Sequence, residues 1–309
     1  MSGSAGRGNE SWDAVLGAID AGARDALPVE AALRWGVARL NGIADRPRME
    51  AERLLAAALI VDRTALLAHP EARLRRAQAL IYVDAIRRRE QGAPLPYILG
   101  RIEFFGLDFV VTPDVLIPRP ETELLVEHAL DDLKGRMRPG SSPTVVDVGT
   151  GSGCIAVALA VSVPELHITA IDIDQAALAV ARSNGLRHGV EDRVCWIRGD
   201  LLGAVPGPID VILSNPPYIA EREWKRLPAS VRQEPRLALL AGREGLASVR
   251  RLLDQARSRL APGGLLLVEM GSGQGDAVRA LARTAFPHAE VTILPDLAGL
   301  DRLLAVRNP

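Results

Sequence analysis

The spacing of apolar residues changes character along the chain near residue 92. Before that point, apolar residues recur at helical spacing, as in the run Leu54, Leu55, Ala58 and Leu59. Prolines at positions 28, 47 and 70 divide this part of the chain into short helices. The pattern therefore predicts a small, wholly helical N-terminal domain over residues 13–92.

Glycine and proline interrupt the next segment, residues 93–115, where we expect a linker with structure of its own. Phe104, Phe105 and Phe109, followed by two valines, favour a short β-hairpin within it. A helix is expected to follow, because Pro120 suits a first helical turn and the acidic residues beside it suit the positive end of a helix.

Short apolar runs alternate with helical stretches through the remaining residues, 116–309. The alternation is typical of an α/β fold with an open, largely parallel sheet covered by helices on both faces. Two late runs add an antiparallel pair at one edge, so the pattern predicts a seven-stranded, Rossmann-like domain. The expected strands are residues 144–148, 167–171, 194–198, 210–214, 264–270, 289–294 and 302–306, with helices such as 154–163 and 175–188 between them.

Composition narrows the possible functions. The chain of 309 residues has a formal net charge of −1, whereas proteins that bind duplex phosphates usually carry a basic balance. Two cysteines and five scattered histidines form no spaced motif, so neither a disulfide framework nor a metal site is expected. No apolar stretch of about 20 residues is present, which argues against a membrane span, and the cytoplasm is the expected location.

The first expected strand of the sheet ends in a glycine-rich turn, Asp147-Val148-Gly149-Thr150-Gly151-Ser152-Gly153. Glycines allow the backbone to turn sharply and to approach a ligand without a Cβ in the way. The dinucleotide-binding template G-x-G-x-x-G fails here, because its last glycine position is occupied by Cys154. Residues 149–153 are therefore a candidate cofactor-binding turn, but one that does not fit NAD.

Carboxylates end the next two strands. Asp172 lies 23 residues after Gly149, at the place where a carboxylate accepts two hydrogen bonds from a ribose diol. Asp174 is free to cap the following helix. The third strand leads to Asp200 and Leu201, a carboxylate and an apolar side chain that could meet the edge and the face of an adenine.

The fourth strand ends in Asn215-Pro216-Pro217-Tyr218, the most specific motif in the chain. Two prolines remove two backbone donors and stiffen the turn. The side-chain oxygen of Asn215 and a nearby backbone carbonyl then present paired acceptors, and Tyr218 supplies a flat face. This arrangement fits a planar NH₂ group, and it lies with the other features at the strand ends where α/β sheets bind ligands.

The chain from residue 94 to 302 resembles the peptide chain release factor N5-glutamine methyltransferase family (the PrmC/HemK group). The matching motifs are Pro96 to Gly100, Ile117 to Glu123, Asp147 to Gly153, Asp172, Asn215 to Tyr218, Glu234 to Arg236, and Asp296 to Arg302. The resemblance implies a class I methyltransferase domain that binds S-adenosylmethionine and needs no metal. It also implies a protein substrate, the glutamine of the Gly-Gly-Gln motif of release factors, held by Asn215, Pro216, Pro217 and Tyr218. Leu201 departs from relatives that have an aromatic residue there.

Other functions stay open at this level. An adenine-N6 or guanine-N2 methyltransferase would use the same Asn-Pro-Pro-Tyr geometry on nucleic acid, although the chain has no evident DNA-reading or base-flipping module. A glutamine of a ribosomal protein is a further possible acceptor. A cofactor-binding module without catalysis, or an NAD-binding protein, fits less well, because the Asn215–Tyr218 motif is intact and the last dinucleotide glycine is absent. We expect no stable nucleic-acid or membrane partner.

Overall fold

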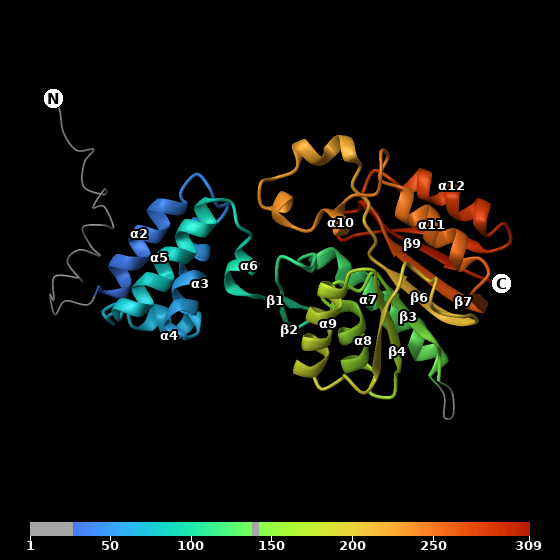
Figure 1. Cartoon of the computed structure of the whole chain (residues 1–309), viewed down its shortest axis with the longest axis horizontal. Helices are drawn as coiled ribbons and strands as arrows, with labels where there is room; N and C mark the ends of the chain where they lie inside the picture. Colours follow the sequence, from blue (N-terminus) through green and yellow to red (C-terminus); the bar gives the residue numbers. More distant parts are fainter. Residues whose placement is uncertain (1–26, 138–141) are drawn as a thin grey trace. The chain divides into compact units, whose positions relative to one another are not determined.

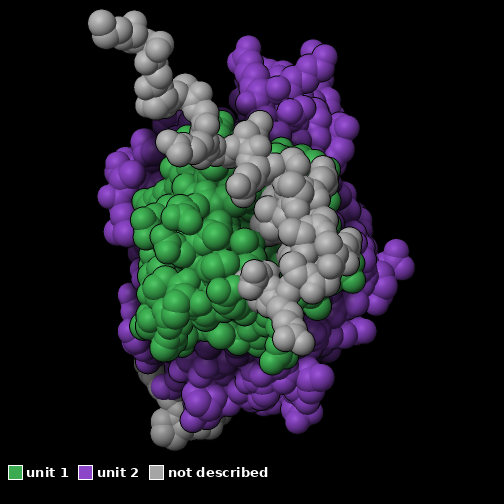
Figure 2. Space-filling model, turned by 90° about the vertical axis from the view of Figure 1, so that its left-hand side faces the viewer, with its two compact units in different colours: residues 1–99 green, residues 100–309 purple. Residues whose placement is uncertain are grey.

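The computed structural model describes residues 27–137 and 142–309. The chain divides into two compact units, Met1–Leu99 and Gly100–Pro309, which are coloured separately in Figure 2. The division falls within residues 93–115, the segment predicted as a linker. The beginning of the predicted helical domain, residues 13–26, lies outside the described residues.

The first unit is helical, as the apolar spacing predicted. Its helices are α2 (Val29–Leu40), α3 (Pro47–Leu59), α4 (Arg63–Ala68), α5 (Arg76–Glu90) and α6 (Leu95–Leu99). Leu40, Leu55, Tyr82 and Ile86 are among the fully buried side chains that form its own hydrophobic core. Gly36 is needed in α2 because a Cβ at that position would collide with the Tyr82 ring.

The predicted hairpin is present and belongs to the second unit. Strands β1 (Arg101–Phe104) and β2 (Leu107–Val110) are joined by a tight turn in which Phe105 and Gly106 have φ values of 52° and 71°. The rings of Phe104 and Phe109 lie 6.0 Å apart, edge to face, and both are buried in the core of residues 100–309. The hairpin is thus anchored by its aromatic side chains.

A seven-stranded sheet forms the centre of the second unit, which confirms the predicted α/β fold. Its strands follow the order β5-β4-β3-β6-β7-β9-β8; β9 is antiparallel to both of its neighbours, and the other neighbouring pairs are parallel. The strands are β3 (Val145–Val148), β4 (Ile168–Asp172), β5 (Val194–Arg198), β6 (Ile209–Ser214), β7 (Leu260–Glu269), β8 (Glu290–Pro295) and β9 (Asp301–Arg307).

Strand β7 begins at Leu260, whereas the sequence predicted a start at Gly264. The pairing with β6 shifts between Ile209, which faces Leu260, and Val211, which faces Leu265. Residues 261–264 therefore form an irregularity inside the strand. The Pro and Gly residues there look like the end of a strand in sequence, which is why the earlier start was missed.

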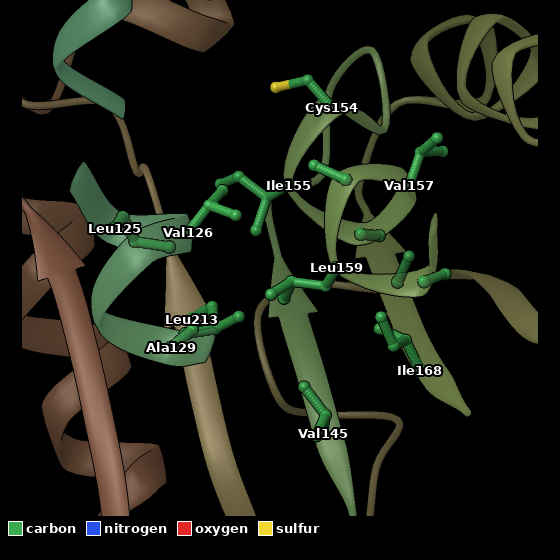
Figure 3. Close-up of a cluster of buried hydrophobic side chains, with 14 of the residues drawn as sticks. Leu125, Val126, Ala129, Val145, Cys154, Ile155, Val157, Leu159, Ile168 and Leu213 are labelled. Atoms are coloured by element: carbon green, nitrogen blue, oxygen red, sulfur yellow. The ribbon is translucent and has the colours of Figure 1, made fainter. Parts of the chain in front are cut away.

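Helices cover both faces of the sheet (Figure 1). On one face lie α7 (Pro120–Arg136), α8 (Cys154–Ser162) and α9 (Gln175–Arg187), and on the other lie α11 (Ala247–Ala256) and α12 (Gly275–Ala285). Figure 3 shows α7 and α8 packing apolar side chains over the strands on the first face. In β3, Val145 belongs to this core and Val146 to the core on the opposite face. Both faces of the strand are buried, which explains its unbroken apolar sequence.

The order of the strands brings the predicted site residues to one place. Val148, at the end of β3, pairs with Ile171 on one side and with Ser214 on the other. The chain leaves β3 toward β4 and later returns to β6 on the opposite side, so the strand order reverses at β3. Ligands bind at such reversal points, outside the carboxyl ends of the strands. The segment between β6 and α11, residues 215–246, carries the short helices η1 (Glu221–Arg226), η2 (Val231–Gln233) and α10 (Arg236–Leu239).

Candidate active site

A cleft opens at the carboxyl ends of β3, β4 and β6. Most of the residues predicted from the sequence to bind a cofactor line it, together with residues from the segment before α7 and from α10. The predicted residues in the lining are Gly149, Gly151, Asp172, Asp200, Leu201, Asn215 and, from the predicted acceptor motif, Pro217.

The three glycines of the turn after β3 serve two different purposes. Gly149 and Gly151 line the cleft with φ values of 74° and 55°, and a Cβ on either would meet no atom within 4 Å. Their backbones can therefore approach a ligand directly. Gly153, also at positive φ, instead packs inward, since a Cβ there would lie 3.1 Å from the Cβ of Ala181.

Thr150 and Ser152 hold the glycine turn in place but are not in the lining of the cleft. The Thr150 hydroxyl donates to Oδ2 of Asp147 at 2.6 Å. The backbone oxygen of Ser152 accepts a hydrogen bond from the Asn184 side chain at 2.9 Å. Both residues are buried, so their contribution to the site is the conformation of the turn.

Asp172 is fixed beside the glycine turn. Its carboxylate accepts the backbone N–H of Gly151 at 2.8 Å and that of Asp174 at 2.9 Å. Asp174 in turn caps α9 by accepting from the Ala176 N–H, as predicted. Burial raises the pKa of the Asp172 carboxyl, and the backbone hydrogen bonds oppose this rise. Each carboxylate oxygen keeps a second acceptor position for a ligand.

The far end of the cleft is formed by residues 199–201 and by Ile173. Oδ2 of Asp200 lies 2.6 Å from a guanidinium nitrogen of Arg251. Arg251 also lines the cleft. Leu201 has a φ of 53°, a conformation that L-residues adopt rarely and that often marks a functional site. Ile173 is 46% exposed and lines the cleft, although the sequence analysis passed over it. An apolar residue directly after the carboxylate that ends β4 was the available signal.

A second, smaller cavity of about 170 Å³ adjoins this cleft. Tyr218 and Arg119 line it, and Leu116, Asn215 and Ala238 line both cavities. Asn215 thus stands at the boundary between two adjoining cavities. Direct transfer of a group between two bound molecules needs this kind of adjacency.

Only one of the two polar atoms in the Asn215 side-chain amide has a hydrogen-bond partner among the described residues. Its Nδ2 donates to the Thr122 hydroxyl oxygen at 3.0 Å. Its Oδ1 is buried and has no hydrogen-bond partner among the described residues. Because a buried acceptor without a partner costs free energy, this atom is poised to accept from a ligand.

Tyr218 faces the small cavity, whereas Pro216 is buried and is not in the lining of either cavity. Burial raises the pKa of the Tyr218 hydroxyl to about 12, and the nearby Glu269 adds to this rise. The hydroxyl is therefore neutral in the physiological range. The Gln274 side chain donates to the Tyr218 backbone oxygen at 2.9 Å and so holds the backbone of the motif at this residue.

Comparison with known proteins identifies the family to which the chain is similar. Two family models match the chain, the methyltransferase small domain over residues 120–231 and the PrmC N-terminal domain over residues 31–100. The release factor glutamine methyltransferase of Moorella thermoacetica is 46% identical, over 91% of this chain and 99% of that protein. The protein of the same name from Bordetella pertussis is 44% identical, over 83% of this chain and 93% of its own.

The chain belongs to the release factor glutamine methyltransferase family. It is an S-adenosylmethionine-dependent methyltransferase. The fold is also found in the catalytic domain of hMettl16, solved in complex with the MAT2A 3'UTR hairpin 6. That domain is 19% identical with a TM-score of 0.53, over 75% of this chain and 84% of that one, so the likeness concerns the fold alone.

Several residues around the smaller cavity were not singled out from the sequence. Thr122 and Arg119 lie in the Pro118–Glu123 run, which was noted only as a motif. Arg119 pairs with the buried Glu234 at 2.5 Å, and Glu234 also accepts the backbone N–H of Ile117 at 3.1 Å. Glu269 ends β7 and is buried beside Thr122. An acidic residue at the end of an apolar strand was the signal for Glu269.

Proposed function

We propose that this chain transfers the methyl group of S-adenosylmethionine to the side-chain amide nitrogen of the glutamine in the Gly-Gly-Gln motif of a peptide chain release factor. The observation that carries this proposal is the position of Asn215. Asn215 lines both cavities, and its buried Oδ1 has no hydrogen-bond partner among the described residues. The names of the relatives supply the identity of the substrate.

The residues of the large cleft fit S-adenosylmethionine. Gly149 and Gly151 leave space for the amino-acid part of the ligand beside their backbones. Asp172 offers carboxylate acceptors for a ribose diol. Ile173 and Leu201, which line the cleft, offer apolar contacts for an adenine.

The acceptor pocket must orient the amide rather than activate it by deprotonation. An amide nitrogen is a weak nucleophile because its lone pair is delocalised into the carbonyl. S-adenosylmethionine, when bound, supplies an electrophilic methyl group on a sulfonium, so no metal is required. Asn215 Oδ1 accepts one N–H of the amide and Tyr218 packs against its plane, whereas Pro216, which is buried and lines neither cavity, stiffens the turn between them. Such positioning contributes several kcal/mol, about 2.7–4 for one well-placed hydrogen bond.

The substrate of this pocket is proposed to be a flexible protein loop. A cavity of about 170 Å³ admits one narrow side chain, which must reach in from a segment that can approach the rim. Glycines on either side of the glutamine permit that approach. The formal charge of −1 favours a protein over a phosphate backbone as the partner.

As part of the same proposal, the chain has no stable nucleic-acid or membrane partner and works in the cytoplasm. Within residues 27–137 and 142–309, no helix has both the length and the apolar character that crossing a bilayer demands.

Parallel methylation assays test the substrate. The purified chain is incubated with labelled S-adenosylmethionine and one of four acceptors: a release factor, its Gln→Ala loop variant, a ribosomal-protein fraction and a DNA duplex. Mass spectrometry should place one methyl group on the loop glutamine of the release factor. The loop variant and the duplex should stay unlabelled. Equal labelling of the loop variant, or labelling of the duplex, would overturn the assignment.

A further inference from the structure

Three side chains from distant parts of the sequence form one buried hydrogen-bonded chain behind the acceptor pocket. The Thr122 hydroxyl donates to Oε2 of Glu269 at 2.6 Å, and Thr122 Oγ1 accepts from Nδ2 of Asn215 at 3.0 Å. Thr122 and Glu269 are each 1% exposed. Neither is in the lining of the acceptor cavity, so they act on a ligand through residues that are: Asn215, and Tyr218, whose hydroxyl lies 3.5 Å from Oε1 of Glu269.

The direction of this chain of hydrogen bonds follows from the chemistry of its ends. An ionised carboxylate only accepts, so the single hydroxyl proton of Thr122 must point to Glu269. The hydroxyl then offers a lone pair to Asn215, which can meet it only with its NH₂ group. The Asn215 oxygen is consequently turned away from Thr122, and it has no hydrogen-bond partner among the described residues.

We propose that ionised Glu269, acting through the Thr122 hydroxyl, sets the orientation of the Asn215 amide, so that Thr122 and Glu269 are positioning residues for methyl transfer. This inference rests on the proposed function, because it matters only if Asn215 Oδ1 accepts the N–H of the substrate. It extends that function to two residues that touch no substrate.

Protonation of Glu269 allows the direction of these hydrogen bonds to reverse. A protonated carboxyl can donate to Thr122 Oγ1, which frees the hydroxyl proton to turn toward Asn215. The Asn215 amide can then rotate and present its NH₂ group to the substrate. This donor would face the N–H donors of the substrate amide, so no hydrogen bond could form. The oriented form therefore prevails above the pKa of Glu269 and is lost as the pH falls through it.

The groups around Glu269 bring its protonation into a pH range in which enzyme activity can be measured. Burial raises the pKa of Glu269 to about 7, and the charge of Glu121, from α7, acts in the same direction. Arg302 from β9, the Thr122 hydroxyl and the Tyr218 hydroxyl, 3.5 Å from Oε1, oppose the rise. The turnover number should thus show an acid limb near neutral pH.

Two matched variants test the role of the hydroxyl. Thr122→Val keeps the shape of the side chain and removes the hydroxyl, whereas Thr122→Ser keeps the hydroxyl. We expect Thr122→Val to lower kcat on a release factor by about tenfold or more, with the calorimetric Kd for S-adenosylmethionine unchanged. Thr122→Ser should restore kcat to within about threefold of the wild type. Equal kcat values in the two variants would overturn the inference.

A third variant tests the role of the charge. Glu269→Gln cannot ionise, so its kcat should lack the acid limb that we expect of the wild-type chain between about pH 6 and 8. An unchanged acid limb in Glu269→Gln would contradict the assignment. Failure of the wild-type chain to methylate any release factor would instead count against the proposed function, which keeps the two failures distinct.

Discussion

The side chain of Asn184 pairs with both backbone groups of Val110. Its Oδ1 accepts the Val110 N–H at 2.8 Å, and its Nδ2 donates to the Val110 oxygen at 3.0 Å. The same Nδ2 also donates to the backbone oxygen of Ser152 at 2.9 Å. Asn184 therefore ties the hairpin and the glycine turn to α9, and the cofactor cleft depends on a residue that does not line it.

We predict that Asn184→Ala lowers the free energy of unfolding by about 2 kcal/mol or more, because it leaves buried backbone groups of Val110 and Ser152 without partners. The affinity for S-adenosylmethionine should fall as well, since the glycine turn loses its support. Denaturant titration and calorimetry measure the two effects. Ser183→Ala, at an exposed position on the same helix, is the control and should change neither. Wild-type stability in Asn184→Ala would rule out this role.

The parts of the fold and of the candidate site that depend on consecutive residues could be predicted from the sequence. The alternation of apolar runs located every strand of the sheet, and the glycine turn followed the first of them directly. The Asn215–Tyr218 motif was recognised because four residues in a row carry its chemistry. Such features are local, and periodicity and turn chemistry suffice to find them.

Residues that act through distant side chains could not be found in this way. Thr122 and Glu269 lie 147 positions apart, and Asn184 and Val110 lie 74 apart. Nothing in either local sequence marks one as the partner of the other, because only the order of the strands brings them together. The bulged start of β7 was missed for a related reason, since its partner strand, not its own sequence, keeps residues 261–264 in the sheet.

Asn215→Ala should remove most of the activity and leave cofactor binding largely intact. The substitution deletes the acceptor oxygen that faces the substrate, and the loss of one such hydrogen bond lowers kcat by about 10²–10³-fold. The Kd for S-adenosylmethionine should change by less than about threefold, because the cleft has many other contacts. Steady-state kinetics and calorimetry on the same sample separate the two. Methylation at close to the wild-type rate would show that Asn215 does not orient the amide.

Asp172→Ala should weaken S-adenosylmethionine binding by about 1–3 kcal/mol. Two losses contribute: the proposed ribose contact, and the hydrogen bond that holds the Gly151 N–H. Asp192→Asn serves as the control because it removes a charge at an exposed position that does not line the cleft, so its affinity should match the wild type. Calorimetry decides, and an unchanged Kd in Asp172→Ala would remove Asp172 from the cofactor site.

The buried Asp147 carboxyl predicts a pH dependence of stability. Burial raises its pKa to about 7, and Oδ1 has no hydrogen-bond partner among the described residues. A carboxyl with a folded-state pKa above its unfolded value of about 3.9 favours the folded state most at low pH. That contribution is lost as the pH rises from about 4 through 7.

Asp147→Asn should consequently narrow the difference in Tm between pH 5 and pH 8. The amide keeps an acceptor for the Thr150 hydroxyl and carries no charge at either pH. Asp254→Asn, at an exposed position on α11, should leave the difference as it is in the wild type. A difference in Tm that is the same in Asp147→Asn and in the wild type would contradict the assignment of this group.

The helical unit, residues 27–99 as described, is predicted to dock the protein substrate and to take no part in the chemistry. It has a hydrophobic core of its own, and every residue that lines the cofactor cleft or the acceptor cavity comes from position 114 or later. A truncated chain that begins at Gly100 should thus bind S-adenosylmethionine with unchanged affinity. On an intact release factor, its kcat/KM should fall by about tenfold or more, because contacts outside the acceptor pocket are lost. On a short peptide with the Gly-Gly-Gln sequence, the truncated and whole chains should be equal. Equal kcat/KM values on the intact release factor would show that the helical unit has another role.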